Sequence, residues 1–307
     1  MDYAIRLFAA HLGDRRRSPL TVTRYRRVLD EFSLYLGKCF GTRDWTLDDV
    51  VTNCLVRFLR GTAGHEPAAS TFNVRLAALR TFFEFLVAQG LAARNPAEAI
   101  PFAPTRSKEP VFLSVKEYQK LLSVARAITS AHLIVRNEAI LVLLFNTGLR
   151  VSELASLTLD MLDPGTKAFR NIPLKGGQFG SVEWNRETER VLDAWGQVRK
   201  AWSTPDETRA LFVSERGLPL SVRSIQQMFN CYSAELRLKK RVTAHVLRHS
   251  MATELLRQGY DIRVIAGLLH HSSLNTTKKY AHLVDALRRE ALASLEPGRP
   301  PRRRPQD

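Results

Sequence analysis

Three side chains that can contact an anion lie close together in the segment Thr243-Ala-His-Val-Leu-Arg-His249. His245 and Arg248 are three residues apart, so a helix would place them on one face. A single buried histidine is more often a hydrogen-bonded core residue than a functional one. An arginine on the same face changes that balance, because burying both groups without an anion would cost several kcal/mol. We therefore interpret this pair as part of an anion site.

A metal site is the other use that this segment could have. His245 and His249 are four residues apart, which is a ligand spacing, but the helix lacks the glutamate of the H-E-x-x-H motif. The intervening Arg248 would also repel a divalent cation. We predict no metal here.

A second arginine lies in the segment Thr147-Gly-Leu-Arg-Val-Ser-Glu-Leu154. We expect a helix to begin at Ser152, an N-cap residue type, with Glu153 in its first turn. Arg150 would then lie in the turn before a helix N-terminus. A guanidinium at such a position can bind two oxygens of a phosphate in fork geometry. Taken alone, however, Arg150 is more often an ordinary surface residue.

Lys175 and Tyr280 are two further candidates. Lys175 begins a Lys-Gly-Gly sequence between two expected strands, 168–174 and 181–184, and its glycine neighbours would let the hairpin tip approach a ligand closely. Lys167 is the alternative lysine, although it precedes the first of these strands. Tyr280 lies in the polar, basic segment 274–282, where an isolated tyrosine would be read as a surface aromatic.

Composition narrows the classes of protein that could carry these groups. The 307 residues hold 46 Lys and Arg against 30 Asp and Glu, a net charge of +16 that suits a polyanionic partner. With 45% hydrophobic and 25% charged residues, the chain is expected to be folded and not embedded in a membrane. We see no export signal. Three scattered cysteines indicate reduced thiols in a cytoplasm and exclude secreted disulfide scaffolds and structural zinc modules.

Two domains are expected to position these residues. Apolar residues at helical spacing predict helices over 20–37 and 73–89 and a shorter one over 50–59, with basic outer faces, and four prolines between residues 94 and 110 predict a linker. We expect a helical domain over 1–107 that ends in this linker. An α+β domain over 108–296 would have helices near 114–125, 136–145 and 221–232, a small antiparallel sheet, and an almost wholly helical segment 243–295 broken near Gly259 and Ser272. A disordered basic tail would follow over 297–307.

The order Arg150, Lys175, His245-x-x-Arg248, His271 and Tyr280 resembles that of the tyrosine site-specific recombinases, the phage integrase family. The boxes T-G-L-R-V-S-E-L, H-x-L-R-H and H-S-S-L-x-T-T-x-x-Y match jointly and at family-like spacings. The resemblance extends over essentially the whole folded chain. The compact length is most similar to that of the Xer type. The resemblance implies a SAM-like helical core-binding domain and an α+β catalytic domain that together form a C-shaped clamp on DNA.

The resemblance also implies roles. Tyr280 would attack the scissile phosphate to give a 3′-phosphotyrosyl bond and a free 5′-hydroxyl, while Arg150 and Arg248 hold the non-bridging oxygens. His245 would assist proton transfer at the tyrosine, and Lys175 would protonate the leaving oxygen. The supporting residues implied are His271, which would contact the phosphate or pack beside Tyr280, Glu153, which would orient Arg150, and His249, which would buttress the site.

Partners follow from the same resemblance. It implies double-stranded DNA with a specific core site, two protomers per site, and four in a synapse that passes through a Holliday junction, with a partner recombinase possible. No ATP, metal or other cofactor is expected. Basic residues proposed to contact DNA are Arg24, Arg26, Arg27, Arg75 and Arg106. The apolar stripe over 283–295 could pack within its own domain or on a neighbouring protomer.

Some alternatives stay open at this point. The family usually has glycine where this chain has His270, so the sequence leaves undecided which of His270 and His271 faces the phosphate. A type IB topoisomerase-like enzyme would use the same chemistry to relax supercoils, and an inactive DNA-binding protein would keep only the phosphate contacts. The biological role could be chromosome-dimer resolution or the integration and excision of a mobile element.

Overall fold

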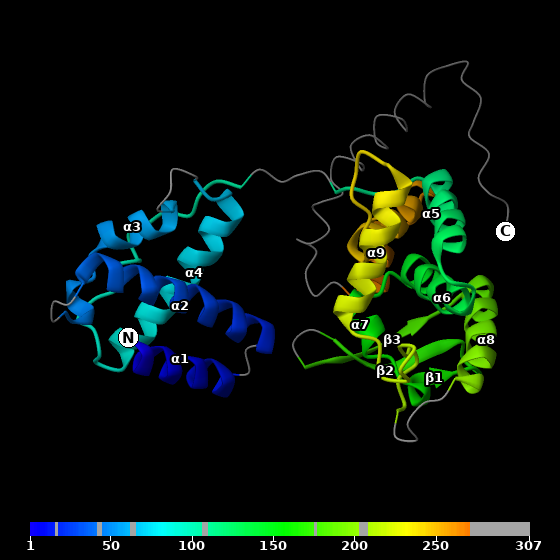
Figure 1. Cartoon of the computed structure of the whole chain (residues 1–307), viewed down its shortest axis with the longest axis horizontal. Coiled ribbons are helices and arrows are strands. Elements are labelled where there is room, and N and C mark those ends of the chain that lie inside the picture. The colour runs from blue at the N-terminus through cyan, green and yellow to red at the C-terminus, as the bar shows by residue number, and fades with distance from the viewer. Residues whose placement is uncertain are drawn as a thin grey trace, which may run out of the picture. The chain divides into compact units, whose positions relative to one another are not determined.

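The chain folds into two units, which we call the N-terminal unit, Met1–Ser107, and the C-terminal unit, Lys108–Asp307 (Figure 1). The computed structural model describes residues 1–15, 18–41, 45–61, 66–105, 110–174, 177–202 and 208–270. Each unit has a hydrophobic core of its own. The expectations for Arg106, Lys175, His271, Tyr280, the stripe over 283–295 and the tail over 297–307 lie outside the described residues.

Helices build the N-terminal unit. They are α1 (Asp2–Asp14), α2 (Pro19–Phe40), α3 (Thr52–Arg60) and α4 (Ala69–Ala88), with a 3-10 turn at Leu47–Asp49. The predicted helices correspond to α2, α3 and α4, whereas α1 was not predicted. Packing of α1 on α2 and α4 buries Phe8, whose ring lies 5.4 Å from that of Phe82 between centroids.

The prediction that the second helix ends at Gly37 is wrong. The helix continues to Phe40, because its apolar face continues: Leu36 is fully buried and Phe40 packs on the core. A glycine inside a helix costs only about 1 kcal/mol, which this packing offsets. The helix stops at Gly41, where φ is +62°.

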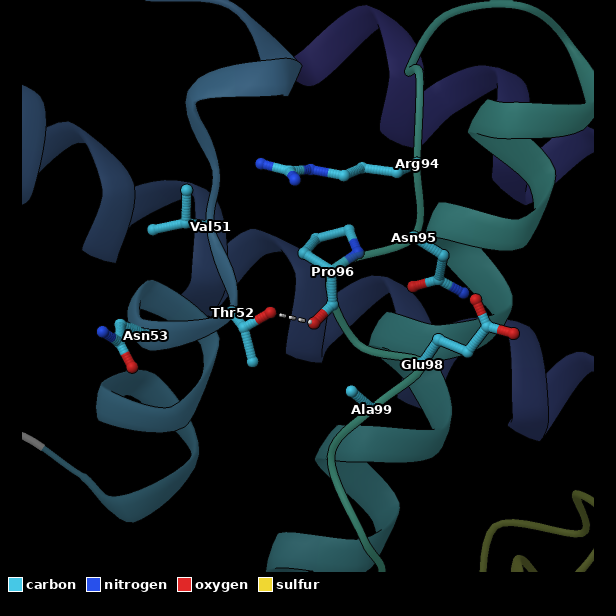
Figure 2. A pocket seen from close by; sticks show the side chains of 8 residues that line it. All are labelled: Val51, Thr52, Asn53, Arg94, Asn95, Pro96, Glu98 and Ala99. Carbon is cyan, nitrogen blue, oxygen red and sulfur yellow. Dashed lines mark hydrogen bonds between the residues drawn. The ribbon is translucent and has the colours of Figure 1, made fainter.

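The proline-rich segment is fixed to the N-terminal unit through Ala103. Asn73 on α4 donates to the carbonyl of Ala103 at 2.9 Å and accepts from its N–H at 2.8 Å. Arg80 donates to the carbonyls of Ala97 and Glu98 at 3.0 and 2.9 Å. Figure 2 shows the start of α3 facing this segment across an open pocket, with Thr52 Oγ1 donating to the carbonyl of Pro96 at 3.0 Å. Hydrogen bonds thus hold the segment 97–103 against the N-terminal unit.

The C-terminal unit is mostly helical with one small sheet. Its elements are α5 (Val115–Ile128), α6 (Ala131–Thr147), α7 (Val151–Ala155), a 3-10 turn at Leu159–Met161, β1 (Leu162–Asp163), β2 (Ala168–Pro173), β3 (Phe179–Glu183), α8 (Arg186–Ala201), α9 (Val222–Leu236), α10 (Ala244–Arg257) and α11 (Ile262–Leu268). The strands are antiparallel in the order β1-β2-β3. The fold class expected from the sequence, helical with a small antiparallel sheet, is therefore confirmed. Strand β1 and helix α8 were not predicted from the sequence.

Helix α6 is the centre of this unit. Helix α8 packs alongside α6 (Figure 1). Residues 139–144 of α6 are all buried, and so is Trp195 of α8. A helical segment that is apolar on every side must be covered on every side, so residues 139–144 lie inside the core of the unit. Among the residues that the structure describes, no helix is long and apolar enough to cross a membrane.

Candidate active site

The turn that carries Arg150 begins where α6 ends. Gly148 caps α6 in the left-handed conformation, with φ +64° and ψ 18°. A Cβ added there would lie 2.7 Å from Leu269 Cδ2 and 2.8 Å from Met251 Sδ, closer than real Cβ atoms approach a neighbour. Both the conformation and the space therefore require glycine.

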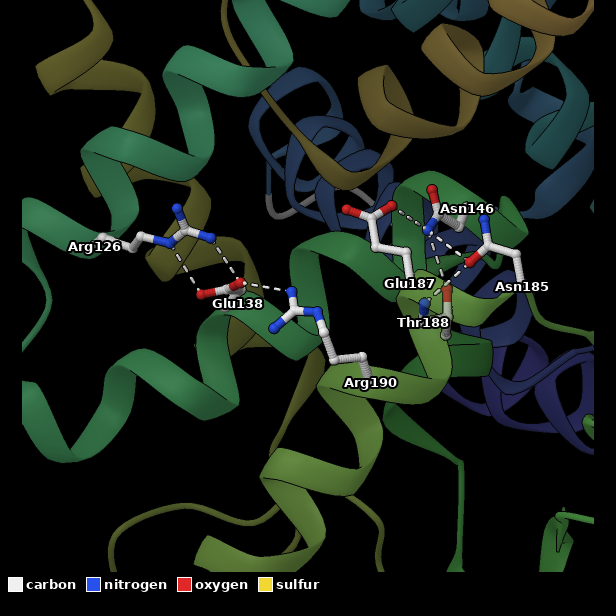
Figure 3. A network of polar contacts seen from close by, with 7 residues as sticks. All are labelled: Arg126, Glu138, Asn146, Asn185, Glu187, Thr188 and Arg190. Atoms are coloured by element: carbon white, nitrogen blue, oxygen red, sulfur yellow. Dashed lines mark hydrogen bonds and ion pairs between the residues drawn. The ribbon is translucent and has the colours of Figure 1, made fainter.

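Polar contacts fix the last turn of α6 to α8, as Figure 3 shows. Asn146 donates to Asn185 Oδ1, Glu187 Oε2 and Thr188 Oγ1 at 3.0 to 3.1 Å. The turn that follows Asn146 thus starts from a fixed point, and Arg150 is only four residues further along the chain.

Arg150 and Glu153 form a pair at the start of α7. Glu153 Oε2 accepts from the backbone N–H of Arg150 at 2.7 Å, and its Oε1 accepts from Arg150 Nη1 at 2.5 Å. The Glu153 side chain is 4% exposed, against 33% for Arg150. The prediction that Ser152 is the N-cap is wrong, since α7 begins at Val151 with Arg150 as its N-cap residue. The buried Glu153 carboxylate thus binds one edge of the Arg150 guanidinium, and the opposite edge can bind a ligand.

Arg248 joins two segments that are distant in sequence. It lies on α10, is 3% exposed, and donates from Nη1 to the carbonyl of Gly148 and from Nη2 to the carbonyl of Leu269. The first contact lies two residues from Arg150, and the second lies at the end of α11. The fold thus brings the Arg150 turn and the Arg248 helix to one place, although about 100 residues separate them in the chain.

The two other histidines of the motif lie on the same helix. Thr243 caps α10 by accepting from the N–H of Val246 at 3.2 Å, which fixes the helix start. The rings of His245 and His249 are 4.4 Å apart between centroids, with His245 exposed and His249 partly buried. Within the described ranges, no group of three or more His, Cys, Asp or Glu side chains could hold a metal ion.

His270 completes the described part of the site; the sequence left undecided whether this histidine or His271 faces the phosphate. The residue has φ +45°, and its ring Nδ1 lies 3.3 Å from the position that a Cβ on Gly180 of β3 would take. Burial lowers the pKa of its imidazole, Glu153 raises it, and Arg248 and Arg150 lower it further. The carbonyl of Gly148, two residues before Arg150, is the contact that brings Arg248 close to the Arg150 turn. The only sequence signal was an adjacent pair of histidines where the family usually has glycine first.

The remaining predicted residues differ in their surroundings. The alternative lysine, Lys167, precedes β2 and forms an ion pair with Glu189 at 2.8 Å. Arg24, Arg26 and Arg27 are exposed on α2, although Arg26 and Arg27 face Asp30 and Glu31 at 3.9 and 3.2 Å.

Arg75 on α4 is less accessible. Its side chain is 24% exposed, bonds Glu31 at 3.2 Å, and lies over the Phe58 ring at 5.2 Å. These contacts give Arg75 a packing role within the N-terminal unit besides the DNA contact proposed for it.

Comparison with known proteins agrees with this geometry. The model of the Phage integrase family matches residues 111–286, and that of the Phage integrase N-terminal SAM-like domain matches residues 5–90. The chain belongs to the phage integrase family. It is 33% identical over 290 residues to the tyrosine recombinase XerC of Roseiflexus castenholzii, covering 92% of this chain and 90% of that protein. The resemblance seen in the sequence is thereby confirmed, and the chain is an enzyme of the tyrosine recombinase class.

Two solved structures share the fold. The XerH site-specific recombinase bound to a palindromic difH substrate, a post-cleavage complex, has a TM-score of 0.71 at 24% identity, covering 94% of this chain and 84% of that one. A lambda integrase dimer bound to a core site also has a TM-score of 0.71, at 18% identity, covering 91% and 94%. In both structure comparisons the matched residues extend over the N-terminal and the C-terminal unit, as the two family matches also do.

Proposed function

We propose that this recombinase cuts and rejoins double-stranded DNA at a specific core site through a 3′-phosphotyrosyl intermediate on Tyr280. The observation that carries the proposal is the contact of buried Arg248 with the carbonyl of Gly148, which brings Arg248 to the turn that presents Arg150. Two guanidinium groups at one point suit a phosphodiester that gathers negative charge on its non-bridging oxygens during attack.

Each step of strand cleavage is then assigned to one side chain. The Tyr280 oxygen forms a bond to phosphorus while the bond from phosphorus to the 5′-oxygen breaks. His245 accepts the phenolic proton, and Lys175 gives a proton to the departing 5′-oxygen. Rejoining reverses these transfers with the 5′-hydroxyl of another strand, so the energy of the phosphodiester is kept in the covalent bond. Each arginine donor is expected to contribute roughly 10²- to 10³-fold in rate.

The assembly is proposed by analogy with the structural neighbours. The lambda integrase structure holds a dimer on a core site, and the XerH complex holds a palindromic substrate. We propose that this enzyme likewise binds a core site as a dimer and pairs two sites in a tetramer, passing through a Holliday junction. A partner recombinase would replace one pair of subunits. The biological role is chromosome-dimer resolution or mobile-element integration and excision.

A covalent-trapping experiment tests the chemistry. A library of nicked duplexes with a randomised core is incubated with the protein in EDTA, and SDS-stable adducts are isolated and sequenced. Wild type should form an adduct that Tyr280→Phe loses. Tyr260→Phe is the matched control, since Tyr260 is an exposed tyrosine of the same unit and should leave the adduct unchanged.

Three results would contradict the proposal. An adduct that persists in Tyr280→Phe would overturn the nucleophile, and no adduct from the wild type would favour an inactive DNA-binding protein. Relaxation of a plasmid carrying the trapped sequence, without recombinant product, would favour the topoisomerase alternative.

A further inference from the structure

His270 lies where three elements of the C-terminal unit meet. It follows α11, and its own N–H donates to the carbonyl of Gly267 at 2.9 Å. The carbonyl just before it, that of Leu269, accepts from Arg248 on α10. With φ +45°, His270 holds a backbone conformation that a residue with a side chain adopts only at a cost in free energy. Its surroundings must therefore hold it there.

The third element is β3. A Cβ built on Gly180 would lie 3.2 Å from His270 Cε1 and 3.3 Å from its Nδ1, so the imidazole ring lies directly against the backbone of this strand. The backbone of the next residue, Ser181, also raises the pKa of the ring. A larger residue at 180 would meet Leu174 Cδ1 at 2.7 Å as well as the ring, so the absence of a side chain there leaves room for the contact.

We propose that His270 is a positioning residue that fixes β3 and the end of α11 to the Arg150–Arg248 pair. The inference rests on the proposed function, because the pair that His270 would position is the proposed phosphate clamp. The ring acts through the backbone of β3 on one side and through the Leu269 carbonyl, which holds Arg248, on the other.

The charges around the ring make this role dependent on pH. Burial is the largest effect and holds the pKa of His270 below its usual value of 6.5, Glu153 raises it, and Arg248 and Arg150 lower it. The contacts from β3, Gly180 and the Ser181 backbone, carry no charge. The ring is therefore neutral at neutral pH. A proton on it would repel both arginines and compete with Arg150 for Glu153, so acidification should disturb the pair.

Two substitutions separate the ring's contacts from its titration. His270→Gly accepts the backbone conformation and removes the side chain. His270→Asn tolerates the same conformation, keeps a polar amide in place of the ring, and cannot titrate between pH 5 and 8. His132→Asn is the control, since His132 is an exposed histidine of the same unit that pairs with Glu215 at 2.7 Å.

The probe is the nicked duplex whose sequence the wild type traps. We expect His270→Gly to form the adduct roughly 10- to 100-fold more slowly, as misplacement of a reacting group does, while its Kd for the duplex changes less than about threefold. His270→Asn should recover most of the rate near pH 7.5. As the pH falls through the pKa of His270, which lies below 6.5, the wild-type rate should fall, whereas that of His270→Asn should fall less.

An NMR titration of the imidazole resonances needs no DNA. His270 should titrate below 6.5, and Glu153→Gln should lower that value further by removing the charge that raises it. A value at or above 6.5 contradicts the inference.

The rates of adduct formation can also contradict the inference. If His270→Gly reacts like the wild type, or if His270→Asn shows the same pH profile as the wild type, the inference is wrong. If the wild type forms no adduct, the proposed function fails, and the NMR titration still decides whether His270 lies among the charged groups as described.

Discussion

Replacing Gly148 by alanine should damage both the stability and the chemistry of the C-terminal unit. The residue caps α6, its φ is +64°, and its carbonyl accepts from Arg248. The methyl group of alanine would meet Leu269 Cδ2 at 2.7 Å and Met251 Sδ at 2.8 Å. Leu269 is fully buried and Met251 is 7% exposed, so the space to move away is small.

The size of the effect has two parts. A non-glycine residue in the left-handed conformation costs roughly 1–2 kcal/mol. Forcing one extra methyl group into a packed site costs typically about 1–3 kcal/mol. The sum is a loss of about 2–5 kcal/mol in the free energy of unfolding, which for a domain of this size lowers Tm by roughly 5–15 °C.

Gly259→Ala is the matched control. Gly259 also follows a helix and has positive φ, +90°, but nothing lies within 4 Å of the position of its Cβ. It should lose only the conformational part, about 1–2 kcal/mol. Thermal melts give Tm for both variants, and adduct formation on the trapped duplex gives the rate.

The two variants should also differ in the reaction. Any shift of the Gly148 carbonyl moves an acceptor of Arg248, so Gly148→Ala should lose adduct formation even at a temperature where it is fully folded. Gly259→Ala should keep it. Equal Tm values for the two variants, or normal cleavage by folded Gly148→Ala, would refute the packing argument.

Other contacts give further expectations. Glu153→Gln keeps an acceptor for the Arg150 backbone N–H but loses the negative charge that pairs with the Arg150 guanidinium. We expect the free energy of unfolding to fall by about 1–3 kcal/mol, which thermal melts would show as a lower Tm, and adduct formation to be slower. The pKa of Glu138 is held below its usual 4.5 by the hydrogen bond from Arg126, against the effect of burial, so the stability it adds is present above 4.5 and lost as pH falls through the folded value; acid titration of unfolding should show a weaker dependence in Glu138→Gln. Arg24→Ala should weaken DNA binding and reduce the slope of log K against log salt by about 1, with Tm unchanged, whereas Arg75→Ala should lower Tm because it removes the Glu31 and Phe58 contacts.

Much of the helical framework could be read from local patterns. The apolar spacing over 20–37 and 73–89 is one-sided, and such a face must be buried whatever it packs against. Caps are a local contact too, since Ser114, Ser221 and Thr243 each accept from an N–H of their own first turn, but residue type alone misplaced the cap at Ser152. Helix α1 was missed although it buries Phe8, and α8 was missed because charged residues outnumber its few buried apolar positions.

The motif residues were found from the sequence because chemistry restricts their types. Arg150, His245 and Arg248 were chosen for what a guanidinium and an imidazole can do, and their order along the chain pointed to the family. Their roles, with those of Lys175, His271 and Tyr280, stay predictions that the trapping experiment addresses.

Only the tertiary structure could show what holds the arginines in place. Arg248 reaches carbonyls about 100 residues before it and 21 residues after it, and no local pattern encodes an acceptor on another element. The lack of space for a side chain at position 148 is explained only by the contacts of Leu269 and Met251 with this residue in the folded structure. His270 resembled a departure from the family pattern, yet the fold places its ring on β3 between charges from α7 and α10. Residue type determines what chemistry a side chain can do, whereas the packing of distant segments determines which side chains come together in one site.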